Sequence, residues 1–262
     1  MDLGLQDKRA LVLASSRGLG FGIAKALVEE GAQVLLTGRS EDRLVEGQKM
    51  LNDQGPGKAF IKPCDLSDQS SAKILFDAAK ENLGGIDILV NNTGGPPPGL
   101  VTEPDNTLWL HHFEMMVLRV IEITNLCLPE FRKRGEGRVL TVGSGGVAQP
   151  IPNLGMSNTL RSALVGWNKT LSTEVAKDGI TANMLIPGRI HTERVDELDA
   201  AAAKRQDKTV EEVATASRAT IPAGRYGLVE EFASVAAFLV SSRASYVTGS
   251  VVRCDGGQIR GV

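Results

Sequence analysis

RALVLASSRGLG, residues 9–20, is the stretch that decides the fold of this chain. Its apolar first half leads into a turn of small residues, and a helical pattern follows from Phe21 to Glu30. Backbone N–H groups at a helix N-terminus, with the positive end of the helix dipole behind them, can receive a pyrophosphate, and glycines let it approach closely. The stretch therefore predicts a strand, an anion-binding turn and a helix, although a glycine match alone is weak evidence.

Short apolar and β-branched runs alternate with helical patterns along the rest of the chain. This alternation is typical of βαβ units around a parallel sheet. We therefore predict an α/β fold with one domain over residues 1–262, in which a doubly wound, Rossmann-type, seven-stranded parallel sheet is flanked by helices. Strands are expected at 8–14, 33–38, 58–64, 86–91, 137–143, 180–186 and 249–254, and helices near 18–30, 40–53, 67–83, 105–134, 154–178 and 228–241.

The segment 189–222 departs from this alternation. It contains an alanine run at 200–203 and many charged side chains. A charged, alanine-rich helix is most often a solvated surface, but one that follows the carboxyl end of a late strand can also cover a ligand crevice. The sequence leaves both interpretations open, and 189–222 is a candidate substrate lid.

Length and charge exclude several classes of protein. The chain has 262 residues, 42% hydrophobic content and a net charge of −2, so it can bury a full core and has no basic surface for nucleic acid. Its first residues lack the pattern of a secretory signal, and no apolar run approaches the roughly 18 residues that span a bilayer. We therefore expect a cytoplasmic protein without nucleic-acid or membrane partners. Cys64, Cys127 and Cys254 are far apart in apolar contexts, which predicts buried or half-buried thiols and no metal site.

Several spaced motifs then follow along the chain. They are Ser16-Arg17-Gly18-Leu19-Gly20, Asn91-Asn92-Thr93-Gly94, Trp109, Leu128-Pro129, Asn183, Pro187-Gly188, and Tyr246-Val247-Thr248-Gly249 followed by Asp255-Gly256-Gly257. With these motifs in this order, the chain resembles the short-chain dehydrogenase/reductase family over essentially its whole length, especially the 3-oxoacyl-carrier-protein-reductase-like branch. Taken singly, motifs such as Asn91-Asn92 are ordinary turn formers.

The resemblance implies a binding site for a nicotinamide dinucleotide. By it, Asn91 and Gly94 line the crevice after the fourth strand, Asp65 lies beside the adenine, and Ile190 and Thr192 meet the nicotinamide amide and the phosphate. The expected cofactor-binding residues are Ser15, Ser16, Arg17, Gly18, Leu19, Gly20, Arg39, Asp65, Leu66, Asn91, Gly94, Arg161, Pro187, Gly188, Ile190 and Thr192.

Charge favours NADP(H) over NAD(H) as the cofactor. An acidic residue at the end of the second strand would bind a ribose 2′-OH and repel a 2′-phosphate. Here Arg39 follows that strand and Arg17 projects from the first turn, so two guanidinium groups can clamp a 2′-phosphate by charge-assisted hydrogen bonds. Two solvated surface arginines are the alternative. Ala14 is a departure, because the family usually has glycine there and the methyl group could crowd the pyrophosphate.

The family's catalytic tetrad of Asn, Ser, Tyr and Lys is largely replaced. Ser144 matches the serine, but Ser157 stands at the tyrosine position, Arg161 at the lysine position and Met116 at the asparagine position. Ser157 and Arg161 are four residues apart and share a helix face, where Arg161 could anchor a ribose or an oxyanion. Serine is a much poorer acid than a phenol, and arginine cannot release a proton near neutral pH. The expected catalytic residues are Ser144, Ser157 and Arg161.

Other titratable side chains offer few substitutes for the missing phenol. The two tyrosines, Tyr226 and Tyr246, fall in C-terminal segments that resemble structural parts of the family. The adjacent His111 and His112 point about 100° apart on a helix, so at most one is expected to face the crevice. His191 lies close to the expected nicotinamide, and histidine exchanges protons near neutral pH.

Three functions compete on this evidence. The favoured one is an NADP(H)-dependent carbonyl reductase or alcohol dehydrogenase for a small-molecule carbonyl or alcohol, including 3-oxoacyl-like substrates, in which Ser144, Ser157 and a water carry the proton. The second is an NADP(H)-binding module or sensor without turnover, and the third is a lyase- or dehalogenase-like use of the fold. The resemblance also implies a homotetramer or homodimer through two apolar stripes, which would equally pack on the chain's own sheet. The stripes are Phe113, Met116, Val117 and Val120, and Leu164, Trp167 and Leu171.

Overall fold

The computed structural model describes residues 1–261, and within them seven parallel strands form one sheet. The order across the sheet is β3-β2-β1-β4-β5-β6-β7, so the direction of strand addition reverses between β1 and β4. This confirms the predicted doubly wound sheet. The strands are β1 (Arg9–Val12), β2 (Gln33–Gly38), β3 (Lys58–Pro63), β4 (Ile88–Asn91), β5 (Gly137–Val142), β6 (Ile180–Pro187) and β7 (Val251–Cys254).

The helices follow the predicted order with two differences. The helix expected over 105–134 consists of three pieces, because a π-helical turn, η1, interrupts it. The segment 189–222 forms two separate helices, α7 and α8. None of the described helices is long and apolar enough to cross a membrane. The helices are α1 (Gly18–Glu29), α2 (Glu41–Gln54), α3 (Ser71–Leu83), α4 (Asn106–Phe113), η1 (Glu114–Leu118), α5 (Arg119–Arg134), α6 (Gly155–Val175), α7 (Glu193–Gln206), α8 (Val210–Ala219) and α9 (Val229–Leu239), with short 3-10 turns at η2 (Gly145–Val147), η3 (Ala176–Asp178) and η4 (Ser242–Ala244).

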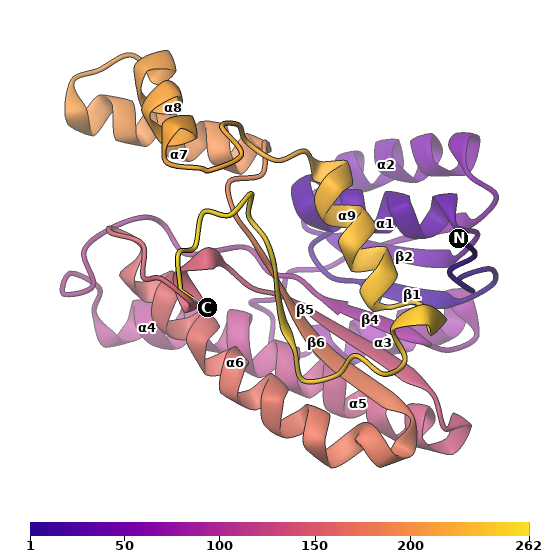
Figure 1. The fold of residues 1–262 in the computed structure, drawn as a ribbon. Coiled ribbons are helices and arrows are strands. Elements are labelled where there is room, and N and C mark those ends of the chain that lie inside the picture. Colours follow the sequence, from indigo (N-terminus) through magenta and orange to yellow (C-terminus); the bar gives the residue numbers. More distant parts are fainter. Residues whose placement is uncertain (262) are drawn as a thin grey trace.

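Two helical layers cover the two faces of the sheet (Figure 1). The apolar stripes of α1, α2 and α9 pack on one face, with Ile23 and Phe232 fully buried. Those of α3, α5 and α6 pack on the other face, around Leu75 and Phe131. In Figure 1, α7 and α8 stand outside both layers, beyond one end of the sheet. The three cysteines are buried or half-buried free thiols, as predicted.

The turn after β1 depends on close approaches of the backbone. A Cβ atom at Gly20 would lie 2.6 Å from the carbonyl oxygen of Ala14, so glycine alone fits where α1 meets the strand. Ala14 has a φ of +46°, in the left-handed region. That region costs roughly 1–2 kcal/mol for a residue with a Cβ atom. Backbone strain therefore lies at the position where the family resemblance implies glycine.

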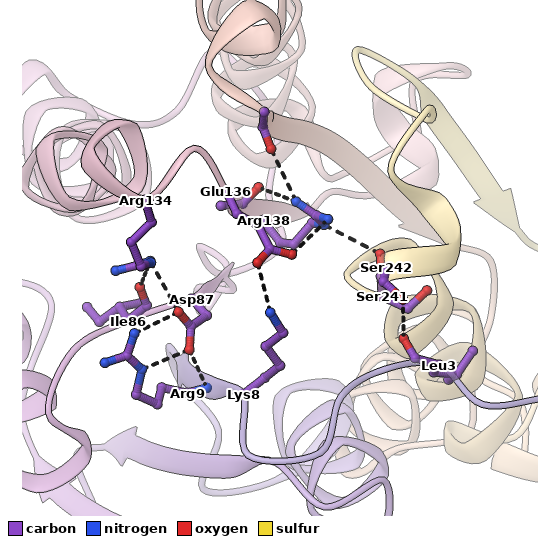
Figure 2. Close-up of polar contacts among 12 residues, drawn as sticks. Leu3, Lys8, Arg9, Ile86, Asp87, Arg134, Glu136, Arg138, Ser241 and Ser242 are labelled. Carbon is purple, nitrogen blue, oxygen red and sulfur yellow. Dashed lines mark hydrogen bonds and ion pairs between the residues drawn. The ribbon is translucent and has the colours of Figure 1, made fainter.

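A network of ion pairs closes the amino end of the sheet (Figure 2). Arg9 donates to both carboxylate oxygens of Asp87 at 2.8 Å, and Arg134 Nη2 lies 3.3 Å from the same carboxylate. Burial alone would raise the pKa of Asp87, but the hydrogen bonds from Arg9 outweigh it and the pKa falls below its usual value. Arg138 Nη2 donates to Glu136 Oε1 at 3.2 Å beside this cluster. The charged groups at this end bind one another.

The apolar stripes expected at subunit contacts are mostly internal. Met116, Val120 and Leu164 are almost fully buried within the chain, in clusters that pack against the sheet, whereas Phe113 is exposed. A face that is already buried in one chain gives no evidence for assembly. The stripes are therefore core residues, and the homotetramer or homodimer stays a prediction.

Candidate active site

A cavity of about 850 Å³ opens at the carboxyl ends of the strands. Its wall contains residues that follow β1, β2, β3, β4, β5 and β6, so it spans the point where the strand order reverses. Open parallel sheets bind ligands at this point, and the volume lies in the range of about 300–1,000 Å³ that is usual for ligand pockets. α7 contributes a further wall, through Glu193, Arg194, Val195, Glu197 and Leu198.

Most residues predicted from the sequence lie together on this wall. They come from six strand ends and from α6, so their shared position results from the tertiary fold. These residues are Ser16, Arg17, Gly18, Leu19, Arg39, Asp65, Leu66, Gly94, Ser144, Ser157, Arg161, Pro187, Gly188, Ile190 and Thr192.

Three predicted cofactor-binding residues, Ser15, Gly20 and Asn91, do not line the cavity, and their role at a cofactor stays a prediction. Ser15 is fully buried, where its Oγ donates to the carbonyl of Val12 at 2.7 Å and accepts from Thr37 N–H at 2.9 Å. Asn91 is also buried and donates to Thr124 Oγ1 at 3.0 Å. Gly20 is buried at its close contact with β1. These residues hold the strands and α1 in place behind the wall.

The start of α1 has the features of a pyrophosphate site. Arg17 is the N-cap residue, and no side chain accepts a hydrogen bond from the first turn. Gly18 has a φ of +60°, which favours glycine. Both Gly18 and Leu19 face the cavity. Their uncapped N–H groups and the helix dipole suit an anionic ligand, so this part of the wall fits a dinucleotide.

The two arginines expected at a 2′-phosphate differ in their contacts. Arg39 is exposed on the wall, and no described carboxylate forms an ion pair with it. Arg17 donates to Glu193 and, at 3.4 Å, to Glu197, both on α7. Arg43 also donates to Glu193, at 3.1 Å, and the hydrogen bonds from both arginines lower the pKa of this carboxyl. A phosphate at this position would therefore compete with Glu193 for Arg17.

Arg161 is a buried cation without a carboxylate partner. Its Nη1 donates to the carbonyl of Val142 at 3.1 Å, and its Nη2 donates to those of Thr93 at 3.2 Å and Gly94 at 3.4 Å. Within residues 1–261 no carboxylate lies at ion-pair distance from it. Burial, with a smaller effect of the nearby Arg194, lowers the pKa of Arg161 to about 10. Its charge is thus available to a ligand in the cavity.

The two serines offer hydroxyl groups to the same cavity. Ser144 is half-buried at the end of β5, where its Oγ accepts from Gly146 N–H at 3.2 Å. Ser157 is half-buried on the first turn of α6, on the same helix face as Arg161. Met116, at the expected asparagine position, is fully buried in η1 and supplies no polar group. The wall therefore carries two hydroxyl groups and a guanidinium where the family pattern has four polar groups.

The tyrosines and lysines lie elsewhere. Tyr226 donates from its hydroxyl to Asp199 Oδ2 at 2.7 Å, and Tyr246 is fully exposed. His191 is exposed too, with Nε2 3.3 Å from Asp196 Oδ1, and does not line the cavity. Along the described part of the chain, the cavity wall contains neither a phenol nor an amine side chain.

His111 and His112 both line the cavity, so the expectation that at most one would face it is wrong. His112 is buried and His111 is exposed. The sequence did contain a signal for His112. This residue lies one helical turn before Met116, which the resemblance assigns to the asparagine position of the site.

Comparisons with known proteins agree with this geometry. A family model described as enoyl-(acyl carrier protein) reductase matches residues 13–258. The 3-oxoacyl-[acyl-carrier-protein] reductase of Vibrio cholerae is 33% identical over 257 residues, which cover 97% of this chain and 98% of that protein. Dehydrogenase/reductase SDR family member 4 of Sus scrofa is 33% identical over 255 residues, or 97% and 88% of the two chains.

A solved structure extends the likeness to three dimensions. L-sorbose reductase from Gluconobacter frateurii, complexed with NADPH and L-sorbose, matches with a TM-score of 0.94 at 29% identity, over 100% of both chains. The likeness thus covers the sheet, both helical layers and the segment that contains α7 and α8. Because sequence and structure agree along nearly the whole chain, the protein belongs to the short-chain dehydrogenase/reductase family, in the branch that resembles 3-oxoacyl-carrier-protein reductases.

Proposed function

We propose that this chain is an NADP(H)-dependent oxidoreductase that interconverts a carbonyl compound and an alcohol. One observation carries the proposal: the turn before α1 and the side chains of Arg39, Ser144, Ser157 and Arg161 line a single cavity. This cavity lies where the strand order of the sheet reverses. A binding module without chemistry would not need hydroxyl groups at the family's serine and tyrosine positions. The relatives are named as reductases, which does not favour a sensor or a lyase.

NADP(H) is the cofactor that the charges of this wall suit. The residue directly after β2 is Arg39, where an acidic residue would favour NAD(H). A guanidinium can bind the 2′-phosphate of NADPH through two parallel hydrogen bonds, and NADH has no 2′-phosphate. The solved relative from Gluconobacter frateurii holds NADPH, which supports the same choice here.

Each polar group on the wall has a defined task in this proposal. Arg161 holds the cofactor ribose, and Ser144 and Ser157 hold the substrate oxygen and a water by hydrogen bonds. When bound, NADPH supplies a hydride. The chain's own contribution is therefore position and electrostatics, which account for large rate factors when the reacting groups are aligned.

The substrate has an apolar part in this proposal. Met115, Ile151, Leu154 and Ile259 lie on the wall together with the serines, and such side chains fit a ketone or 3-oxoacyl group of small to medium size. We propose that 189–222 covers the bound substrate, because α7 forms one side of the cavity and Arg194 Nη2 donates across it to the carbonyl of Pro96 at 3.2 Å.

A fluorescence titration with NADPH and, separately, with NADH tests the cofactor proposal. Selective binding of NADPH is the expected result, followed by NADPH consumption with members of a panel of ketones and 3-oxoacyl thioesters. A Ser144→Ala variant should keep NADPH affinity and lose turnover. Failure of the parent chain to bind either nucleotide would remove the proposal, and binding without turnover on the whole panel would favour the sensor.

A further inference from the structure

The polar groups assigned so far do not supply a proton at a useful pKa. Serine hydroxyl groups are very weak acids, and Arg161 stays protonated even with its pKa lowered to about 10. A ketone oxygen that receives a hydride's electron pair needs a proton in the same step or directly after it. The proton donor is therefore expected among the remaining titratable side chains on the wall.

His112 is the side chain on the wall with the suitable chemistry. It is 8% exposed, its Nδ1 is fully buried without a hydrogen-bond partner, and its ring makes no hydrogen bond to any of residues 1–261. An imidazole buried without partners loses its hydration without compensation, which is uncommon in a purely structural residue. Because Nδ1 is enclosed, Nε2 is the nitrogen left to meet a ligand in the cavity.

The backbone around His112 is irregular in the way that functional sites often are. α4 ends one residue later, at Phe113, and η1 follows as a π-helical turn from Glu114 to Leu118. Such turns are rare and occur mostly as single insertions in α-helices, frequently at functional sites. The turn packs against α6 through Met116, Met156 and Leu160, and so brings the end of α4 toward the helix that carries Ser157 and Arg161.

We propose that His112 is the catalytic proton donor for reduction of the carbonyl substrate, in place of the family's tyrosine. The proposal rests on the oxidoreductase function proposed above. In the reduction, the carbonyl carbon accepts the hydride, the π electron pair of the C=O bond moves to oxygen, and the His112 imidazolium transfers its proton from Nε2 to that oxygen. The neutral imidazole is then protonated again from solvent. In alcohol oxidation, neutral His112 takes the hydroxyl proton instead.

The surroundings of His112 set the direction of its pH dependence. Burial, followed by the neighbouring His111, lowers the pKa of His112 below its usual value. The cavity wall carries charged side chains of both signs, including Arg161 on α6 and Glu193, Arg194 and Glu197 on α7. Reduction requires the imidazolium, so kcat/KM for reduction should fall about tenfold per pH unit above that pKa. Oxidation requires neutral His112 and should rise through the same pKa.

The test compares His112→Gln with His111→Gln, because both side chains line the cavity and only His112 is buried. We expect His112→Gln to reduce kcat for the ketone by about 10²–10⁴-fold, the usual loss for a general acid, and to abolish the pH-dependent limb. NADPH binding by fluorescence and the melting temperature should stay at the parent values. His111→Gln should keep turnover and retain the pH-dependent limb, shifted to higher pH because His111 lowers the pKa of His112.

Two further measurements separate a chemical role from a structural one. Addition of imidazole to His112→Ala should restore part of the turnover, because the small donor can occupy the space left by the side chain. In the free parent protein, NMR titration should give His112 a pKa below the usual value for histidine and equal to the kinetic one. Parent-like kcat in His112→Gln would overturn the proposal, as would equal losses of turnover and NADPH binding. No turnover in the parent chain would overturn the oxidoreductase function along with it.

Discussion

Arg138 and Arg161 are two buried arginines that contact opposite ends of β5. Arg138 is the second residue of β5 and is 6% exposed, with Glu136 Oε1 at 3.2 Å and the carbonyls of Gly137, Gly179 and Ser241 at 3.0, 3.3 and 3.4 Å. Arg161 is 8% exposed and donates to three carbonyls, one of them that of Val142 at the end of β5. One guanidinium is neutralised within the chain, and the other keeps its charge for a ligand.

The difference shows what each end of the sheet is built to do. At the amino end, ion pairs such as Arg9 with Asp87 satisfy the buried charges and join β1 to β4 (Figure 2). At the carboxyl end, Arg161 and His112 lack such partners, although unpaired buried groups reduce stability. Perturbed groups without structural partners gather at functional sites, so the contrast supports the proposal that the carboxyl end carries the chemistry.

Among the variants that compare the two ends of the sheet, replacing Arg161 with Met should have the largest effect on function. The apolar side chain keeps most of the length but cannot hold a ribose, so we expect turnover to fall by about 10²-fold, as when reacting groups are misplaced. The carbonyls of Val142, Thr93 and Gly94 lose their donor, but the cost of burying an unpaired charge is removed at the same time. The free energy of unfolding in urea should therefore stay within about 1 kcal/mol of the parent value. Arg161→Lys, which keeps the charge, is the control and should recover part of the turnover. A larger loss of stability than in Arg138→Met would remove the contrast between the two ends.

Arg138→Met should have the opposite profile. It leaves Glu136 and the carbonyls of Gly137, Gly179 and Ser241 without their donor, and each such loss is costly when water cannot replace it. Since Glu136 keeps solvent contact, we expect a destabilisation of about 2–3 kcal/mol, below the full cost of breaking a buried ion pair. NADPH affinity should not change. Urea unfolding and the fluorescence titration measure the two quantities, and loss of NADPH binding in a folded variant would show that the ends are coupled.

Replacing both Arg17 and Arg39 with Gln tests whether the cavity binds the 2′-phosphate of the cofactor. The double Gln variant loses charge-assisted hydrogen bonds of about 1.5–3 kcal/mol to a 2′-phosphate, so NADPH should bind roughly 10–100-fold more weakly. NADH affinity should change little. Glu193→Gln is the matched variant, because it frees Arg17 from its acidic partner and should tighten NADPH binding. Equal weakening of both nucleotides in the double variant would mean that the arginines do not read the 2′-phosphate.

Much of the fold follows from local sequence patterns. The seven strands lie where the apolar runs predicted them, with ends that differ by a few residues, because period and turn residues act locally. The interruption at Glu114–Leu118 was not predicted, since a π-helical turn inserts one residue into a continuous helical pattern and leaves no gap in its apolar face. The apolar stripe around Met116 and Leu164 likewise could not show whether it faces the chain's own core or a second subunit.

The sequence predicted which residues lie at the site better than it predicted the contacts that their side chains make. Motif spacing placed Ser144, Ser157 and Arg161 at one cavity, because strand ends and helix turns fix register. It could not show that Ser15 turns inward to β2 or that Arg17 pairs with α7, since both depend on tertiary neighbours. His112 was underestimated for the same reason: its burial is a property of the folded cavity.

Ala14→Gly tests the contribution of backbone strain at the carboxyl end of the sheet, which is the smallest of the expected effects. Glycine removes the strain at φ +46° but adds freedom to the unfolded chain, and these effects of roughly 1–2 and 0.4–1 kcal/mol leave a net gain of about 0.5–1 kcal/mol. The matched control is Gly84→Ala near the amino end, at φ +76° with no atom within 4 Å of the added Cβ, which should lose a similar amount through backbone strain alone. Tighter NADPH binding in Ala14→Gly would show that the methyl group also crowds the pyrophosphate. Unchanged stability in Ala14→Gly would mean that the carboxyl end carries its unpaired charges but no backbone strain.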